Sequence, residues 1–367
     1  MEITAAVVSA VGEPFEVKSV ELAAPAAGEV AVKIAGVGIC HTDVAVKEGH
    51  LPFPLPGILG HEGSGTVTAV GDGVTRVQVG DKVALSFNSC GACVQCDKDA
   101  PAYCLNFMGL NFSGARSDGS GAISVDGEQA GANFFGQSSL ASHAIAHERN
   151  VVKLPDDAPV ELAGPLGCGV QTGAGAVLNS LDVEPGSALL ITGGGAVGLS
   201  AVLAAVVRGV GKIIVVEPHS ARRDIALDLG ATDVIDPAAG PLSEQVRAIV
   251  PAGVDYALDT TAIVSVLEQI VASLAVRGSL GLIGVPADPA AALPVSLFQS
   301  QLFGLTIRGI VEGDADPQTF IPYLLDLHRK GQFPFDKLIT TMPFSQINEA
   351  VQAQLSGEAI KVVLLAE

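Results

Sequence analysis

The chain contains 367 residues, of which 49% are hydrophobic, and this length favours two domains with substantial cores. Its formal net charge of −19 argues against a general binder of nucleic acids or anionic membranes, because contacts to phosphate groups need lysine and arginine. The N-terminus lacks a basic segment followed by an apolar one, and the apolar run at 196–207 is too short to cross a bilayer. We therefore expect a cytoplasmic protein whose six cysteines are thiols or metal ligands rather than disulfides.

The first part of the chain has the pattern of a strand-rich domain. Val30, Val32 and Ile34 occupy alternate positions, as in a half-buried antiparallel sheet. A helix is expected to begin near Thr42 or Asp43, which are both competent N-caps. Strands are expected at residues 5–8, 30–34, 65–71, 79–84 and within 137–154, whereas the glycine- and serine-rich residues 105–136 are expected to form a loop.

The pattern changes at about residue 160. From there, β-rich runs alternate with helix-like stretches of alanine, leucine and glycine, which predicts βαβ units and a parallel sheet. Residues 300–367 have a mixed pattern again and end in an expected strand at 360–364. The β-rich runs lie at residues 187–192, 212–217, 234–235, 256–259 and 279–284.

Four cysteines form the most specific local motif. Cys90, Cys93, Cys96 and Cys104 have the spacing C-x2-C-x2-C-x7-C, and Gly91 helps the chain to turn between them. Four thiolates on a turning loop suit a structural zinc ion, which prefers a closed tetrahedron of ligands. An iron–sulfur cluster is the alternative, but ferredoxin motifs have a shorter last gap and a proline after the fourth cysteine, where this chain has a leucine.

Two cysteines remain, Cys40 and Cys168, and the run Gly60-His61-Glu62-Gly63 supplies an imidazole among glycines. A catalytic zinc ion keeps three protein ligands and one open position, and two cysteines with one histidine are an attested set. We therefore expect Cys40, His61 and Cys168 to hold a catalytic zinc ion. The alternative is that the two cysteines are small buried hydrophobic residues and that His61 is a core histidine.

Three polar residues lie close to these ligands in the sequence. Asp43 and Glu62 are expected to orient the imidazole and to tune the metal without binding it permanently. The hydroxyl of Thr42 is expected to accept the proton of an alcohol and pass it on. Helix N-capping would also explain a threonine at this position.

A glycine-rich motif follows the strand expected at 187–192. It matches G-x-G-x-x-G, opens a helix-like run, and is followed by a second expected strand that ends at Glu217. Backbone N–H groups at such a helix start bind a pyrophosphate, while an acidic residue binds the ribose diol and repels a 2′-phosphate. NAD is therefore expected rather than NADP. Arg222 and Arg223 are the counter-argument, since arginine can accept a 2′-phosphate, but we expect Arg222 at the ribose edge. The expected contacts are Gly193, Gly195, Ala196, Val197, Gly198, Glu217 and Arg222.

Taken together, these motifs resemble the zinc-dependent medium-chain alcohol dehydrogenase family over nearly the whole chain. Within that family, the runs 135–139 and 167–179 are most similar to those of aryl- (benzyl-) alcohol dehydrogenases. The motifs that fall in family order lie at residues 38–43, 60–63, 79–83, 90–104, 167–169 and 193–198.

The resemblance implies an α/β protein of two domains with the active site in the cleft between them. A GroES-like β-barrel catalytic domain is expected at 1–165 and 300–367, with a structural zinc lobe at about 88–106. A Rossmann domain with a doubly wound parallel sheet is expected at 166–299. A homodimer or homotetramer is also implied, in common with the family.

The resemblance further implies roles for five residues. His41 and Lys361 are expected to contact the cofactor pyrophosphate, and Thr172 to pack near the nicotinamide. Phe87 and Phe135 are expected to line the substrate pocket, with ordinary core packing as the alternative for both.

The chain departs from the family pattern at one position. Many members have a histidine five residues after the first zinc cysteine, where it ends the proton relay that Thr42 starts. This chain has Ala45 there, so proton release needs another route, such as water or His50.

The expected function is NAD-dependent oxidation of an alcohol, aromatic or medium-chain and primary, to its aldehyde, with two zinc ions per chain. Three alternatives remain open from the sequence. They are a glutathione-adduct (formaldehyde-type) dehydrogenase of the same family, a zinc-free quinone reductase of the same superfamily, and a non-catalytic nucleotide-binding zinc protein.

Overall fold

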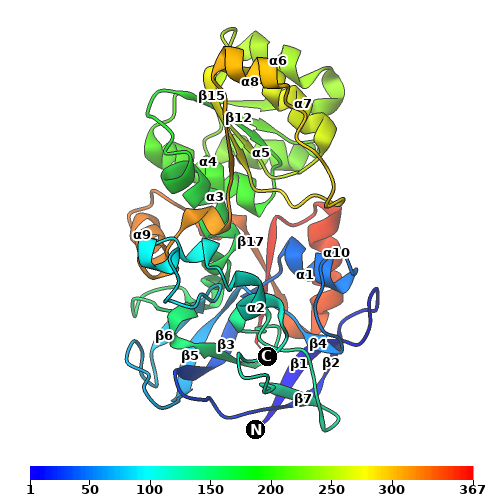
Figure 1. Cartoon of the computed structure of the whole chain (residues 1–367), viewed down its shortest axis with the longest axis vertical. Coiled ribbons are helices and arrows are strands. Elements are labelled where there is room, and N and C mark those ends of the chain that lie inside the picture. The colour runs from blue at the N-terminus through cyan, green and yellow to red at the C-terminus, as the bar shows by residue number, and fades with distance from the viewer. Residues whose placement is uncertain (367) are drawn as a thin grey trace. The chain divides into compact units, whose positions relative to one another are not determined.

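The computed structural model describes residues 1–366, which form two compact units. The first unit comprises Met1–Gln171, Asp316–Leu327 and the residues from Asp336 onward. The second comprises Thr172–Ala315 and His328–Phe335. Figure 1 colours these segments by residue number.

Two sheets of mainly antiparallel strands form the first unit (Figure 1). The five-stranded sheet has the order β4 (Gly57–Ile58), β1 (Glu2–Val8), β2 (Glu16–Leu22), β7 (Ile123–Val125), β8 (Glu128–Gln129). The seven-stranded sheet has the order β10 (Val151–Lys153), β6 (Lys82–Leu85), β5 (Gly63–Val70), β3 (Glu29–Gly38), β18 (Lys361–Leu365), β17 (Ile339–Pro343), with β9 (His143–His147) also paired to β3.

Strand β3 lies between two hydrophobic cores. Val30, Val32 and Ile34 belong to one core, while Ala31 on the opposite face belongs to the other. The strand is therefore buried on both faces at residues 30–32, whereas Lys33 is exposed as the alternation predicted. Four helices complete the fold of this part of the chain: α1 (His41–Lys47), α2 (Phe107–Phe112), α9 (Pro317–Arg329) and α10 (Ile347–Ser356).

Residues 105–136 are more regular than the expected loop. They contain α2, β7 and β8. Ile123 and Val125 are buried in a core, and Phe107 and Phe112 pack against the other core. These apolar contacts between distant segments stabilise elements whose local sequence has little periodicity.

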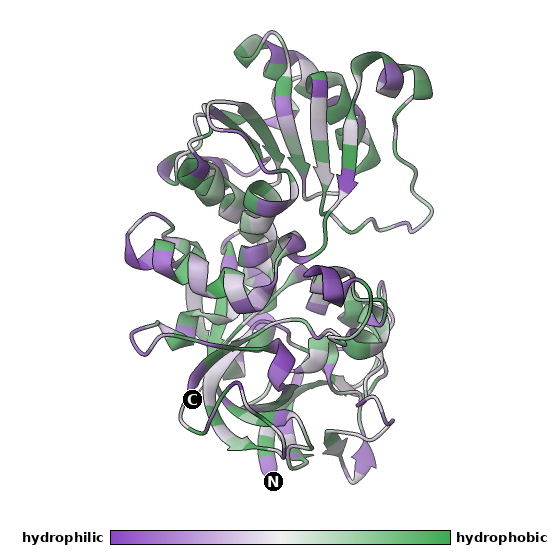
Figure 2. Cartoon of the chain, turned by 60° about the vertical axis from the view of Figure 1, so that its left-hand side comes forward, coloured by the Kyte–Doolittle hydropathy of each residue, from purple (hydrophilic) through white to green (hydrophobic). Residues whose placement is uncertain are grey.

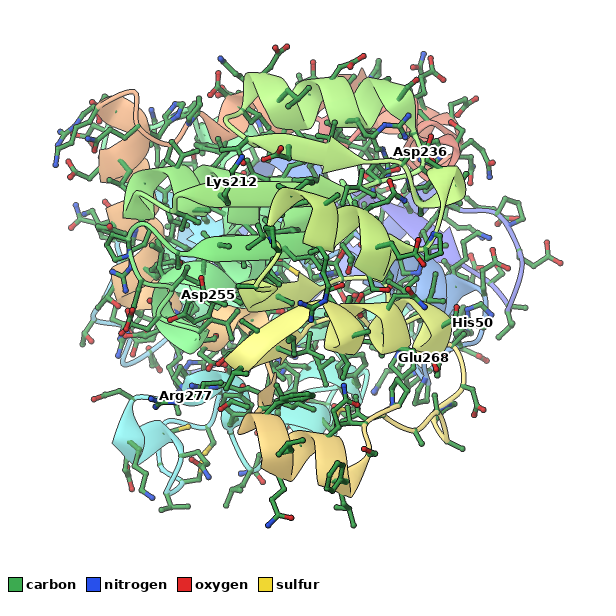
Figure 3. The ribbon with its side chains drawn as sticks, turned by 90° about the horizontal axis from the view of Figure 1, so that it is seen from above. His50, Lys212, Asp236, Asp255, Glu268 and Arg277 are labelled. Atoms are coloured by element: carbon green, nitrogen blue, oxygen red, sulfur yellow. The ribbon has the colours of Figure 1, made fainter. Side chains whose placement is uncertain are left out.

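A six-stranded parallel sheet forms the centre of the second unit, and Figure 3 shows it from above with Lys212 labelled on β12 and Asp255 on β14. Its order is the 3-2-1-4-5-6 order of a dinucleotide-binding fold: β13 (Asp233–Ile235), β12 (Lys212–Val216), β11 (Ala188–Thr192), β14 (Val254–Asp259), β15 (Leu274–Leu282), β16 (Thr306–Gly309). The central strand β11 is buried at every position, as expected for a parallel sheet covered on both faces.

Helices alternate with these strands along the chain, which confirms the expected α/β class. Figure 2 shows that hydrophobic and hydrophilic residues are interspersed along both the strands and the helices. The helices are α4 (Ala196–Arg208), α5 (Ser220–Asp228), α6 (Leu242–Ile249), α7 (Val264–Ser273) and α8 (Leu297–Phe303), preceded by α3 (Gly169–Gly175).

The second boundary between the units lies later in the chain than residue 300. Strand β16 pairs with β15, so the parallel sheet continues to Gly309 and the second unit to Ala315. The first boundary falls at Thr172 rather than at residue 166. Within residues 1–366, we find no helix that is both long and apolar enough to cross a membrane.

Candidate metal centres and nucleotide site

The first unit brings together Cys40, His61 and Cys168. One ligand atom from each residue lies within 4.8 Å of the other two. Cys40 follows β3, His61 lies between β4 and β5, and Cys168 directly precedes α3. Two sulfur atoms and one imidazole nitrogen at this spacing suit a zinc ion that keeps an open coordination position.

The imidazole of His61 has one nitrogen available to a metal. His61 is completely buried, and its Nδ1 lies 3.0 Å from Oδ1 of Asp43. Its Nε2 is buried without a hydrogen-bond partner among residues 1–366. Buried polar atoms in native proteins nearly always have a partner. A metal ion at Nε2 would supply one, whereas the alternative of a core histidine leaves the atom unsatisfied.

Asp43 connects the segments that carry the first two ligands. Its Oδ1 also accepts a hydrogen bond from the Gly60 N–H at 2.9 Å, and its Oδ2 accepts one from the Cys40 N–H at 2.9 Å. This arrangement orients the imidazole and fixes both flanking backbones. Cys40 is therefore the N-cap residue of α1, in place of the expected Thr42 or Asp43.

The surroundings of the three residues favour a thiolate at Cys40, the form that binds metals. A hydrogen bond from Cys168 lowers the pKa of the Cys40 thiol well below its ordinary value, against the opposing effect of burial. The charges of His61 and Lys361 lower this pKa further. Burial disfavours protonation of His61, but Asp43 and Cys40 outweigh it and raise the pKa of the imidazole.

Glu62 pairs with Lys361 instead of with the imidazole. The Nζ atom of Lys361 lies 2.9 Å from both carboxylate oxygens, and it also donates to the Ile39 carbonyl at 2.7 Å. Oε1 of Glu62 accepts from the N–H of Gly169, the residue after Cys168, at 3.1 Å. Burial raises the pKa of Glu62 to about 7, although Lys361 opposes this shift.

This pairing changes the interpretation of Lys361. We expected Lys361 to contact the cofactor pyrophosphate, but its side chain is 4% exposed, and it contacts Glu62 and the Ile39 carbonyl inside the first unit. A buried ammonium group needs a counter-charge nearby, and Glu62 provides it. Lys361 and Glu62 therefore act as a buried ion pair that links β18 to the ligand-bearing segments.

Thr42 lies beside the ligand set on the first turn of α1. Its Oγ1 is 3.7 Å from Sγ of Cys40, and the side chain is partly exposed. His41 is exposed at the helix start, Ala45 is 8% exposed, and His50 is exposed just after the helix. Figure 3 labels His50.

The four remaining cysteines form a second cluster in the first unit. One Sγ atom from each of Cys90, Cys93, Cys96 and Cys104 lies within 4.8 Å of the others. The short helical turns Cys96–Lys98 and Pro101–Tyr103 fold the chain around them, and Gly91 adopts a left-handed φ of 67°. No disulfide joins any of the six cysteines. Four sulfur atoms in a closed group suit a structural zinc ion.

Backbone N–H groups point at the sulfur atoms of this cluster. The Cys90 N–H donates to Sγ of Cys104 at 3.2 Å, and the Leu105 N–H to Sγ of Cys93 at 3.5 Å. Hydrogen bonds from the backbone of Cys96 and Leu105 lower the pKa of Cys93 to about 6. Burial raises the pKa of Cys104 to about 12. A cation in the cluster would offset that cost for Cys104.

The glycine-rich motif of the second unit has the geometry of a pyrophosphate site. Gly193 has a left-handed φ of 99° in the turn after β11. A Cβ at Gly198 would lie 1.9 Å from the Gly193 carbonyl oxygen, so helix and turn are in close contact there. A Cβ at Gly195 would meet nothing within 4 Å. These are the three glycine roles of a dinucleotide motif: tight turn, open approach to the ligand, and close packing.

Glu217 lies beside this turn. Its carboxylate accepts hydrogen bonds from the Gly194 N–H at 2.7 Å and the His219 N–H at 2.9 Å, and it contacts Nδ1 of His219 at 2.5 Å. The backbone and side chain of His219 lower the pKa of Glu217 against the effect of burial, and the charge of Arg222 contributes to the same shift. Glu217 is therefore held ionised next to the Gly-rich turn.

The other expected residues have simpler surroundings. Thr172 is 7% exposed, and its Oγ1 lies 3.5 Å from Oε2 of Glu312. Phe87 and Phe135 are both buried, at 3% and 6% exposure. Phe87 packs against Phe107, whereas the Phe135 ring stacks on His61.

Two residues at the sites were not predicted from the sequence. Gln137 contacts the His61 carbonyl and the Gly63 N–H, and His219 contacts Glu217. His219 is only two positions from Glu217, so that proximity was a usable signal. Gln137 is far from His61 in sequence, and nothing local indicated the contact.

Two family models match the chain. Residues 26–156 match the alcohol dehydrogenase GroES-like domain, and residues 196–329 match the zinc-binding dehydrogenase domain. The chain is 50% identical to geraniol dehydrogenase from Castellaniella defragrans over 363 residues, which cover 98% of this chain and 97% of that protein.

The chain belongs to the zinc-dependent medium-chain alcohol dehydrogenase family. Two crystal structures of the family superpose on it with a TM-score of 0.97 each. The benzyl alcohol dehydrogenase of Acinetobacter calcoaceticus is 42% identical, with complete coverage of both chains. An alcohol dehydrogenase zinc-binding domain protein from Burkholderia ambifaria is 46% identical and covers 100% of this chain and 99% of its own.

Family membership confirms three expectations from the sequence: a GroES-like and a Rossmann-type domain in one chain, an alcohol dehydrogenase, and zinc as the metal. It argues against the zinc-free quinone reductase, because the matched family is a zinc-binding one and both cysteine-containing clusters are present.

Proposed function

We propose that this medium-chain alcohol dehydrogenase oxidises primary alcohols whose carbinol carbon is bonded to an sp² carbon, with NAD+ as the hydride acceptor. The supporting observation is the buried group of Cys40, His61 and Cys168, in which Nε2 of His61 has no other partner. The names of two relatives point to the substrate class, because geraniol and benzyl alcohol are both primary alcohols of this kind.

In this proposal Cys40, His61 and Cys168 hold the catalytic zinc ion, and Cys90, Cys93, Cys96 and Cys104 hold a structural one. A zinc ion in the first set supplies Lewis acidity, which lowers the pKa of an alcohol and favours loss of its proton. Asp43 keeps the imidazole oriented, while the Glu62–Lys361 pair fixes the backbone next to Cys168 and Cys40.

Thr42 is the proposed acceptor of the alcohol proton. Its hydroxyl lies beside Cys40 and is partly exposed, so it can accept that proton at Oγ1 while it donates its own hydroxyl proton toward solvent. Ala45 offers no titratable group for the next step. The proton then leaves through water or through the exposed His50.

The second unit binds NAD through the turn and the helix start at Gly193–Gly198. The free space at Gly195 admits the pyrophosphate to the backbone N–H groups of Ala196 and Val197 at the start of α4. Glu217 binds the adenosine ribose diol and repels a 2′-phosphate, with Arg222 at the edge of the same site. Thr172 is the proposed neighbour of the nicotinamide, and His41 of the pyrophosphate.

A group of aromatic side chains lies next to His61 in the first unit. Phe135 stacks on His61 with ring centroids 4.4 Å apart, and Phe107 lies between Phe135 and Phe87 in the same aromatic group. Flat apolar groups pack well against aromatic rings. Phe87 and Phe135 are therefore the proposed contacts of the substrate chain or ring.

A homo-oligomer is proposed from the surface of the second unit. Helix α8 exposes Leu297, Phe298 and Leu302 at 91%, 74% and 60%, and the adjacent β16 is an edge strand. Large exposed apolar groups next to an open strand edge favour association with a second copy. Sedimentation velocity distinguishes a dimer from a tetramer.

The deciding experiment measures NAD+ reduction with benzyl alcohol, geraniol, ethanol, a polyol and S-hydroxymethylglutathione, together with zinc per chain. Efficient turnover of the first two substrates and about two zinc ions per chain are expected, one for each ligand set. Preference for S-hydroxymethylglutathione would replace this substrate class with the glutathione-adduct one. Binding of NADH without turnover of any alcohol would contradict the proposed activity.

A further inference from the structure

The segment Asn133–Ser138 has an unusual backbone. Asn133, Phe135 and Ser138 adopt left-handed φ angles of 57°, 50° and 52°, and Gly136 lies among them at 67°. Residues with a Cβ atom avoid this region, and a phenylalanine in it is a clear outlier. Such conformations persist only where the surroundings determine them, and they cluster at functional sites. The contacts of this segment identify what it serves.

Gln137 holds the backbone around His61. Its Nε2 donates to the His61 carbonyl at 3.0 Å, and its Oε1 accepts from the Gly63 N–H at 3.1 Å. The same Nε2 donates to the Ser86 carbonyl at 3.1 Å. Gln137 is 2% exposed, so these three bonds form away from competing water. One amide side chain thus binds the peptide groups on both sides of Glu62, starting at the His61 carbonyl.

Ser138 and Ser139, which follow Gln137, also bind the backbone of the segment that carries His61. The Ser139 N–H donates to the Gly60 carbonyl at 2.9 Å, and the Ser138 hydroxyl donates to the Ile58 carbonyl at 2.6 Å. A Cβ at Gly60 would lie 2.3 Å from the Leu140 backbone nitrogen, and one at Gly63 would lie 2.5 Å from Cβ of Ser139. The glycines on both sides of His61–Glu62 therefore allow the two segments to touch.

The aromatic side chains of the segment contact the imidazole itself. Phe135 stacks on His61 at 4.4 Å with an interplanar angle of 23°, and Phe134 meets it edge-on at 5.4 Å and 84°. The left-handed backbone at Phe135 is thus associated with a ring contact to a proposed metal ligand. Asp43 holds one nitrogen of the imidazole, and the two phenylalanines restrict its plane.

We infer that residues 133–140, here called the His61 clamp, hold the imidazole in its ligand position before a metal binds. Gln137 is the positioning residue for the backbone of His61, and Phe135 is the positioning residue for its ring. The inference rests on the proposed role of Cys40, His61 and Cys168 as zinc ligands. It adds that metal retention at this set depends on a segment that contributes no ligand.

The test follows alkylation of each cysteine by iodoacetamide, with peptide mass spectrometry on the zinc-loaded protein in the presence of EDTA. Bound zinc protects its thiolates, so the rate for each cysteine reports metal loss at its own site. In Gln137→Met, Cys40 and Cys168 should react about 10-fold faster or more than in the wild type, the usual effect of losing an outer partner of a metal ligand. The four cysteines of the structural set should keep their rates.

Asn111→Leu is the matched control. Asn111 is completely buried and also makes three hydrogen bonds to the backbone, to Asn88 twice and to Phe107, but none to residues 57–63. Cys40 and Cys168 should stay protected in this variant. If Gln137→Met and Asn111→Leu expose Cys40 and Cys168 equally, the clamp is overturned in favour of general loosening.

A second pair tests the ring if Gln137→Met fails to fold. Phe135→Leu removes the stack on His61, whereas Phe112→Leu removes a ring that packs on Phe134 and Phe135 but not on His61. Only Phe135→Leu should speed alkylation of Cys40 and Cys168 and shift the visible spectrum of the cobalt-substituted protein. Unchanged protection and an unchanged spectrum would overturn the clamp.

Alkylation of the wild-type protein, with and without metal, distinguishes failure of this inference from failure of the proposed function. If EDTA and added zinc leave the alkylation of Cys40 and Cys168 unchanged in the wild type, the metal role of these residues is wrong and the clamp falls with it. If the wild type shows metal-dependent protection and neither clamp variant weakens it, only the clamp is wrong.

Discussion

The carboxylate of Asp43 lies 3.0 Å from Nδ1 of His61 and at the same time accepts the N–H groups of Cys40 and Gly60. One buried side chain thus sets the tautomer of the imidazole and the position of the first cysteine. Asp43→Asn keeps the volume but removes the charge. We expect it to weaken zinc binding at the Cys40–His61–Cys168 set by about 10- to 100-fold.

Competition with a fluorescent zinc chelator measures this loss. The control is Asp81→Asn, which removes a carboxylate paired with Lys153 far from the ligand residues in sequence and should leave zinc affinity unchanged. An Asp43→Asn protein with wild-type zinc affinity would show that the hydrogen bond to Nδ1 contributes nothing to the metal site.

Thr42→Ala should lower kcat by about 100-fold or more, because it removes the hydroxyl that accepts the alcohol proton. Thr42→Ser keeps the hydroxyl and should retain most of the activity. The pH profile of kcat for benzyl alcohol oxidation checks both variants. An unchanged kcat for Thr42→Ala across the pH range would eliminate the relay.

Ala45→His tests the missing relay histidine. Proton release should be as fast as in the wild type or faster. Because Ala45 is only 8% exposed, the larger side chain should also lower the free energy of unfolding by about 1–3 kcal/mol. Solvent isotope effects on kcat report the first effect, and urea unfolding the second. A lower kcat at full folding would show that a histidine at position 45 does not help the proton leave.

Glu217→Gln should reduce the preference for NAD+ over NADP+. The carboxylate contacts the Gly194 N–H at 2.7 Å beside the Gly-rich turn, so its charge repels a 2′-phosphate there. The ratio of kcat/KM for the two cofactors should fall mainly through tighter NADP+ binding. Arg223→Gln is the comparison variant. It removes a guanidinium that contacts the Glu217 and Pro218 carbonyls at the same strand end but leaves the Glu217 carboxylate in place. A preserved ratio in Glu217→Gln would assign the selectivity elsewhere.

The same carboxylate predicts a pH dependence of stability. The pKa of Glu217 is lowered in the folded chain, so its contribution is present above the unfolded pKa of about 4.3 and disappears as the pH falls through the folded pKa. The free energy of unfolding of the wild type should exceed that of Glu217→Gln by about 1.5–3 kcal/mol at neutral pH, as for hydrogen bonds to a charged group. Urea unfolding at several pH values should show this difference shrink below about pH 4.3. A difference that grows on acidification would contradict the assigned direction.

Cys104→Ser should remove the structural metal and leave the catalytic one. Cys104 is buried and closes the four-sulfur cluster, so its loss opens the tetrahedron that holds the loop. We expect zinc content to fall from about two to about one per chain, with a lower Tm. Metal analysis and thermal unfolding check this result, and retention of both zinc ions would show that Cys104 is not a ligand.

Several features could be derived from the sequence because they depend on short-range spacing. The four-cysteine motif, the Gly-rich turn after β11 and Glu217 at the end of β12 each lie within one local unit, whose geometry follows from the residues themselves. The alternation of β-rich and helix-like runs likewise predicted the parallel sheet. Counting cysteines left Cys40 and Cys168 as a pair, even though 128 positions separate them.

Only the tertiary structure showed which charged, polar and aromatic side chains contact one another at the site. Lys361 binds Glu62 because a buried ammonium and a buried carboxylate need each other, and no local pattern indicates that partner. Gln137 and Phe135 reach His61 through a left-handed backbone that packing imposes and composition does not encode. The later boundary at Ala315 has the same origin, since the pairing of β16 with β15 is a long-range contact. Sequence spacing thus predicted the metal ligands, and long-range packing determines how these residues are held.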